Sequence, residues 1–143
     1  MKMLAKVKVA ESPSDIARCF PVMKHLREKL TLDEFEKRIA RQASEGYTLA
    51  FAENGSAVVA VAGFRIIHML ASGKTLYVDD LVTDAACRSQ GFGETLLKWL
   101  IELARQSNCQ TFSLDSGVHR QRAHRFYFVQ GMHISDFHFE LTL

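Results

Sequence analysis

The chain has 143 residues, of which 48% are hydrophobic and 24% are charged, and its net charge is +2. That length suits one domain, and so small a net charge gives no electrostatic reason to expect a nucleic-acid partner. Three cysteines without CxxC or Cys/His spacing argue against a disulfide framework and against a zinc site. We therefore expect one cytoplasmic domain over residues 1–143, with no metal, no signal peptide and no membrane segment.

The first part of the chain predicts a strand and two helices. Alternating residues indicate a strand over 6–11. Ser12 and Thr31 each precede an acidic residue by three positions, which is the capping-box pattern of a helix start. We expect Pro21 to kink or interrupt the first helix and Gly46 to end the second.

The rest of the chain predicts a hairpin followed by alternating strands and helices. Asn54-Gly55 separates two apolar stretches, 47–53 and 56–69, and the second is apolar enough to lie mid-sheet. The later elements are expected at 75–83 (strand), 92–106 (helix), 110–115 (strand), 121–130 (helix) and 133–143 (a strand pair or bent strand). This order predicts an α/β fold with a mixed, mostly antiparallel sheet flanked by helices, and it allows a parallel strand pair near the C-terminus.

The turn Arg88-Ser89-Gln90-Gly91-Phe92-Gly93 stands between a predicted strand and a predicted helix. Glycines let the backbone approach a ligand, and a helix start offers unpaired N–H groups and the positive end of its dipole. A diphosphate would suit such a turn. The lysine of a Walker loop and the third glycine of a dinucleotide-binding turn are both missing. On composition alone, a plain loop is the simpler interpretation.

Three motifs in the correct order resemble the GNAT family of N-acetyltransferases. The glycine turn resembles that family's coenzyme A pyrophosphate loop. The stretch Asp79-Asp80-Leu81-Val82-Thr83 resembles its acidic strand, and residues 123–132 resemble its closing Ala…Leu-Tyr…Gly-Phe segment. The resemblance covers residues 75–132 clearly. It implies a GNAT-like single domain whose parallel strand pair splays at the acyl-CoA site.

The resemblance also implies acetyl-CoA as the cosubstrate. The backbones of Leu81, Val82 and Thr83 would pair with the pantetheine arm as if it were an added strand. Arg120 stands where many relatives have an asparagine that helps hold this arm, and it would reach either a phosphate or an anionic part of the acceptor. The residues implied around the pyrophosphate are Arg88, Ser89, Gln90, Gly91, Phe92, Gly93 and Glu94.

Three residues are the candidates for the chemistry. Tyr127 falls where the family has a general acid for the departing thiolate, and Asp79 and Asp80 are the candidate bases. Because adjacent strand residues point to opposite faces, we expect only one aspartate to face the substrate. The alternative interpretations are a tyrosine with a satisfied hydroxyl, and strand-end acids bound by backbone N–H groups.

We expect an N-acetyltransferase that acts on the primary amine of a small molecule, as a homodimer, by direct attack on acetyl-CoA. Residues 120–127 resemble most closely the branch that includes aminoalkylphosphonate acetyltransferases. Arg120, Arg122 and Arg125 would suit an acidic acceptor, although a solvated helix face explains them more simply. Two alternatives stay open. One is acetylation of protein lysines or N-termini, and the other is a non-catalytic acyl-CoA sensor, which would need neither Tyr127 nor the acids.

Overall fold

The computed structural model describes residues 5–143, and its contacts divide the chain into two compact units, Met1–Ser113 and Leu114–Leu143. The single domain that the sequence predicts over 1–143 therefore stays a prediction. In chain order the elements are β1 (Lys6–Val9), α1 (Pro13–Met23), α2 (Leu32–Ala43), β2 (Thr48–Asn54), β3 (Ala57–Met69), β4 (Gly73–Thr83), η1 (Ala85–Cys87), α3 (Phe92–Gln106), β5 (Thr111–Leu114) and α4 (Gln121–Val129).

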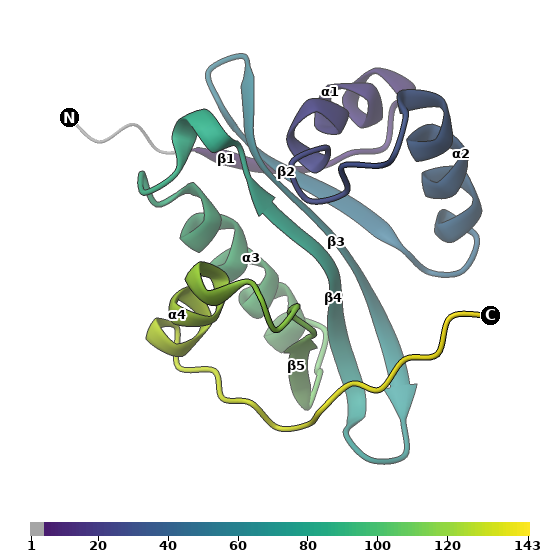
Figure 1. The fold of residues 1–143 in the computed structure, drawn as a ribbon, viewed down its shortest axis with the longest axis vertical. Coiled ribbons are helices and arrows are strands. Elements are labelled where there is room, and N and C mark those ends of the chain that lie inside the picture. The colour runs from purple at the N-terminus through teal and green to yellow at the C-terminus, as the bar shows by residue number, and fades with distance from the viewer. Residues whose placement is uncertain (1–4) are drawn as a thin grey trace. The chain divides into compact units, whose positions relative to one another are not determined.

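The five strands form one sheet in the order β1-β2-β3-β4-β5 (Figure 1). The first three pairings are antiparallel, and β5 runs parallel to β4. The predicted hairpin is present, with Gly55 at φ +64° between β2 and β3. The mixed, mostly antiparallel sheet expected from the sequence is thus confirmed, and so is the central place of β3.

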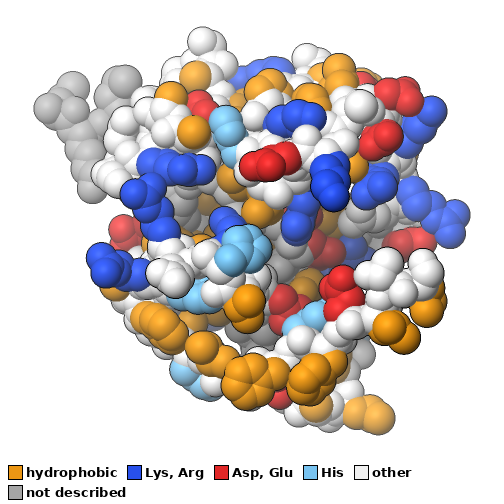
Figure 2. Space-filling view, viewed as in Figure 1, with side chains coloured by type: hydrophobic (Ala, Val, Ile, Leu, Met, Phe, Trp, Pro, Cys, Tyr) orange, Lys and Arg blue, Asp and Glu red, His pale blue; other side chains and the backbone are white. Residues whose placement is uncertain are grey.

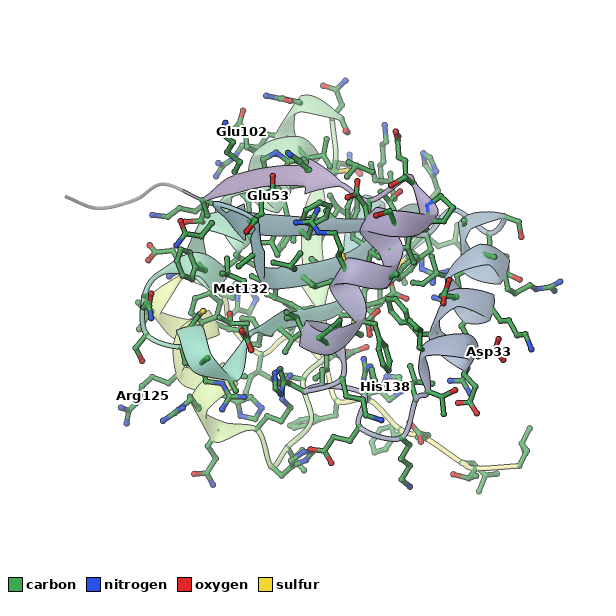
Figure 3. The ribbon with its side chains drawn as sticks, turned by 90° about the horizontal axis from the view of Figure 1, so that it is seen from above. Asp33, Glu53, Glu102, Arg125, Met132 and His138 are labelled. Carbon is green, nitrogen blue, oxygen red and sulfur yellow. The ribbon has the colours of Figure 1, made fainter. Side chains whose placement is uncertain are left out.

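Helices cover both faces of the sheet. Helices α1 and α2 lie on one face and α3 lies on the other (Figures 1 and 3). Leu49 and Phe51 of β2 pack with Phe35 of α2 in one buried cluster. On the opposite face, the Phe64 and Trp99 rings make an edge contact at 6.3 Å. In residues 5–143, no helix is long and apolar enough to cross a membrane.

The helix starts read from the sequence are confirmed at atomic detail. The Ser12 and Thr31 hydroxyls accept hydrogen bonds from the N–H groups three residues on, at 3.1 and 3.2 Å. The Asp15 carboxylate binds Arg18 at 3.1 Å. Helix α1 continues past Pro21 and ends two residues later, because a proline near the C-terminal end removes only one hydrogen bond of the last turns.

The closing strand expected over 133–143 is wrong. Residues 132–143 form no strand in the structure. Apolar side chains alternate along this segment, and hydrophobic side chains line it in Figure 2; Phe137, Phe139, Leu141 and Leu143 are all exposed. Alternation shows which side chains share a face, but a strand also needs a neighbour for its backbone groups. The homodimer expected from the sequence stays a prediction.

The cap of α2 gives a direct test of these local rules. Thr31→Ala removes the acceptor for the Glu34 N–H, and we expect it to lower the free energy of unfolding by about 1 kcal/mol. Thr31→Ser keeps the acceptor oxygen and should match the parent chain. Urea unfolding followed by circular dichroism measures both. An equal loss in the serine variant would contradict the cap as the cause.

Candidate functional site

The turn before α3 has the backbone of an anion site. Ser89 and Gly91 adopt left-handed conformations, with φ +67° and φ +85°. Gly91 is the N-cap of α3, and no side chain caps the first N–H groups of this helix. Thr95 directs its hydroxyl and its N–H to the Gly91 carbonyl, each at 3.0 Å. The helix therefore begins with backbone donors that no capping side chain occupies.

Glycines shape both sides of this turn. A Cβ on Gly93 would lie 2.8 Å from the Thr83 Oγ1, so this glycine lets α3 begin close to the end of β4. A Cβ on Gly91 would meet nothing within 4 Å, which leaves the outer side of the turn open. Phe92 is buried in the core, so only its backbone can meet a ligand.

One edge of β4 is open beside this turn. Strand β5 has four residues against the eleven of β4, and it joins near the start of β4, where the Gln110 N–H donates to the Lys74 carbonyl at 2.7 Å. Among residues 5–143, no strand lies beside Leu81–Thr83 on that side. The Leu81 and Val82 side chains are buried. A ligand at this edge would therefore meet the backbone N–H and C=O groups of β4, and an extended ligand can form hydrogen bonds with them.

A β-bulge places the two candidate bases. Phe64 of β3 pairs with Val78 and Gly63 pairs with Asp80, so Asp79 is an extra residue in β4. A bulge breaks the alternation of side chains along a strand, and bulges are frequent beside active sites. The expectation that adjacent aspartates point to opposite faces is therefore wrong here, because it assumed a regular strand.

Both aspartates are held by side chains that meet around Tyr47. The Arg65 guanidinium binds Asp79 with two hydrogen bonds, of 3.1 and 2.8 Å, and its carbon lies 5.6 Å from the centre of the Tyr47 ring. The Tyr47 hydroxyl donates to Asp80 at 2.8 Å, and the Arg27 Nε donates to the other oxygen of Asp80 at 2.9 Å. The hydrogen bonds to the carboxylates of Asp79 and Asp80 thus come from side chains. The alternative interpretation of the sequence expected them from backbone N–H groups.

Tyr47 is a fixed hydrogen-bond donor in this network. Burial raises the pKa of Tyr47 far above its usual value, and the negative charge of Asp80 raises it further. The phenol therefore keeps its proton near neutral pH and donates it in the hydrogen bond to Asp80. Sequence reasoning missed Tyr47, Arg27 and Arg65. One available signal was Gly63, a glycine inside a strongly apolar strand, which marks close approach of another group.

The second unit carries Tyr127 and Arg120. Tyr127 lies on α4, and Arg120 is the residue before that helix begins. Burial raises the pKa of Tyr127, while the charge of Arg120 and a hydrogen bond from its guanidinium act in the opposite direction. Tyr127 therefore keeps its proton near neutral pH, and the Arg120 guanidinium can stabilise the tyrosinate when the proton leaves. Arg122 and Arg125 are exposed.

Comparisons with known proteins agree on one family. The model of the acetyltransferase (GNAT) family matches residues 12–132. The uncharacterized N-acetyltransferase YhdJ of Bacillus subtilis is 34% identical over 85% of this chain and 86% of its own. An aminoalkylphosphonate N-acetyltransferase of Salmonella typhimurium is 32% identical over 68% of this chain and 62% of its own. A solved structure of a putative acetyltransferase from Agrobacterium tumefaciens superposes with a TM-score of 0.82 at 26% identity, covering 96% of this chain and 99% of that one.

The coupling between Arg120 and Tyr127 can be measured directly. We expect Arg120→Gln to raise the pKa of Tyr127 further, because the burial that raises it remains and the cation that lowers it is lost. Titration of ¹³C-labelled tyrosine by NMR reads this pKa, with Tyr127→Phe to assign the signal. Arg125→Gln removes an exposed arginine of the same helix as a control. A Tyr127 pKa that falls in Arg120→Gln would contradict the contact.

Proposed function

The chain belongs to the acetyltransferase (GNAT) family and is an acetyl-CoA-dependent acetyltransferase, and we propose that it acetylates the primary amine of a small molecule by direct attack. One observation carries this proposal. The carboxylates of Asp79 and Asp80 directly precede the open backbone edge at Leu81–Thr83 on the same strand. Asp80 and Val82 lie about 7 Å apart along a strand, which suits an amine beside a thioester.

We assign the coenzyme to the open edge and the turn. The backbones of Leu81, Val82 and Thr83 would bind the pantetheine arm, and the turn from Arg88 to Gly93 would surround the pyrophosphate. The Glu94 carboxylate is bound to Lys98 at 2.7 Å, so Glu94 would contribute its N–H alone. Backbone donors and the helix dipole supply most of this binding, and exposed Arg88 adds one charge.

The proposed chemistry divides between the aspartates and Tyr127. An acceptor amine arrives as an ammonium and must lose a proton, which a carboxylate of the pair accepts. The nitrogen then attacks the thioester carbon, and the carbon–sulfur bond breaks. Tyr127 gives its proton to the leaving thiolate, and Arg120 stabilises the tyrosinate that forms. The tyrosinate then takes up the excess proton that the attacking nitrogen still carries, which leaves a neutral amide. A phenol whose pKa is raised by burial holds that proton until the thiolate needs it.

We propose an acceptor that carries an acidic group as well as its amine. Support comes from the relative named as an aminoalkylphosphonate N-acetyltransferase, and from three arginines around the start of α4, which are Arg120, Arg122 and Arg125. A guanidinium is well shaped to bind a phosphonate or carboxylate through two hydrogen bonds. The cytoplasmic location and the homodimer expected from the sequence stay predictions.

Two glycine variants separate coenzyme binding from backbone strain. Gly91 and Gly55 both have positive φ and open space around the missing Cβ. Gly91→Ala and Gly55→Ala should therefore cost similar stability, about 1 kcal/mol each. Only Gly91→Ala places a methyl group in the proposed path of the pyrophosphate, and we expect it to raise the Kd for acetyl-CoA about tenfold. Isothermal titration calorimetry measures this, and equal affinities in the two variants would count against the turn.

Turnover tests the proposed reaction itself. Release of free thiol from acetyl-CoA is followed with aminoalkylphosphonates, polyamines, aminoglycosides, amino acids and peptides. We expect turnover with a small primary amine, and a loss of at least about 100-fold in kcat for Tyr127→Phe with an unchanged Kd for acetyl-CoA. Turnover with peptides alone would refute a small-molecule acceptor. Parent-like kcat in both Tyr127→Phe and the double variant Asp79→Ala, Asp80→Ala would refute the assigned chemistry.

A further inference from the structure

The two aspartates differ in how firmly their cations are held. Asp79 and Arg65 form a two-bond pair, and each side chain is only 21% exposed. Asp80 is 14% exposed, but its partner Arg27 is 46% exposed. Arg27 lies between α1 and α2, outside any helix. Arg65, which pairs with Asp79, thus belongs to a strand of the sheet, whereas Arg27 extends to Asp80 from the surface.

Asp80 is fixed from the other side by Tyr47, across an intervening strand. Tyr47 precedes β2 and Asp80 belongs to β4, so the hydroxyl must pass over β3. It passes at Gly63, the register partner of Asp80, where a Cβ would lie only 1.6 Å from the Tyr47 hydroxyl oxygen. Only glycine at position 63 leaves room for this contact. The Tyr47 hydroxyl then holds one carboxylate oxygen at 2.8 Å and leaves the other to a cation.

Arg27 occupies the place where an acceptor ammonium would bind. Its Nε donates to the Asp80 Oδ1 at 2.9 Å, and its Nη2 donates to the Asp79 carbonyl at 3.1 Å. These two oxygens present a negative charge and a second acceptor close together, which are the features that bind an alkylammonium. Arg27 is half-exposed and lies on a connecting segment, so it can leave these oxygens without disrupting a helix or a strand.

We propose that Asp80, held by Tyr47 through the gap at Gly63, is the acceptor-ammonium subsite, and that Arg27 fills it until the amine replaces Arg27. Tyr47 is a positioning residue in this arrangement, and Asp79 stays paired with Arg65. The role of Arg27 rests on the amine acetylation proposed above. Replacement of Arg27 by the amine explains how Asp80 can be ion-paired in the free protein and still bind a cationic substrate. The Arg27 side of this pair is open to solvent, which weakens the pair, so the exchange should cost no more than about fivefold in affinity for the amine.

The exchange has a spectroscopic signature that does not need turnover. In ¹⁵N-labelled protein, the Arg27 Nε–H signal is identified by its loss in Arg27→Lys. Titration with propylammonium chloride should move this signal to the position of a free arginine. Neither 1-propanol nor sodium chloride at equal ionic strength should do so. A signal that propylammonium leaves in place, or that sodium chloride moves equally, would overturn the exchange.

Kinetics with the best amine of the thiol-release panel provide the second test. Arg27→Gln should lower the KM for the amine by up to about fivefold and leave the KM for acetyl-CoA unchanged, since the internal competitor is gone. Arg27→Lys should stay close to the parent, and Arg41→Gln, which breaks an exposed pair with Glu45, is the matched control. A raised amine KM in Arg27→Gln would overturn the proposal, because Arg27 would then be binding the acceptor.

Tyr47→Phe tests the positioning role separately. It keeps the ring and removes the hydroxyl, and we expect kcat/KM for the amine to fall about tenfold with the Kd for acetyl-CoA unchanged. A parent-like kcat/KM would show that Tyr47 is only a core residue. If no amine is acetylated by the parent chain, the acetylation proposal fails, while the NMR titration still decides whether Arg27 yields to an ammonium.

Discussion

The sheet depends on one constraint, which is that β3 is covered by helices on both faces. Its residues from Val59 to Phe64 are all buried, and none carries a charge. Charged groups beside this stretch therefore lie on the neighbouring strands or further along β3, as Arg65 does, and any side chain that joins β2 to β4 has to pass over β3. Gly63 is where such a crossing occurs, and the contact between Tyr47 and Asp80 exists because of it.

The bulge at Asp79 brings the carboxylates of Asp79 and Asp80 together in one site. In a regular strand, two successive aspartates would divide between the two faces, and one would point toward the apolar face that α3 covers. The extra residue lets both carboxylates find cations near Tyr47, through Arg65 and Arg27. Their two negative charges are matched by two positive ones, so this part of the sheet stays close to neutral. A cationic acceptor must then be taken up by exchange of partners, since little long-range attraction is left to draw it in.

The parts of the fold that the sequence predicted best are those set by neighbouring residues. Helix α3 begins and ends where its apolar spacing and its glycine turn indicated, and the caps at Ser12 and Thr31 depend on residues three positions away. The bulge at Asp79 depends on the register between β3 and β4, and this register cannot be predicted from the residues of one strand alone. Along the C-terminal segment the alternation was real, but the structure provides no strand there, because pairing depends on a partner and not on the segment alone.

The same division separates the coenzyme half of the site from the acceptor half. Coenzyme recognition uses backbone donors at a helix start and an open strand edge, so it needs glycines and a particular element order but few specific side chains. Such a site is visible in sequence motifs, which is why the turn and the acidic strand indicated the family. Acceptor recognition uses side chains brought together from separate elements, with Arg27 from one connection, Tyr47 from the start of β2 and Asp80 from β4. Because these residues are joined only by the fold, the substrate of such a chain has to be read from its structure.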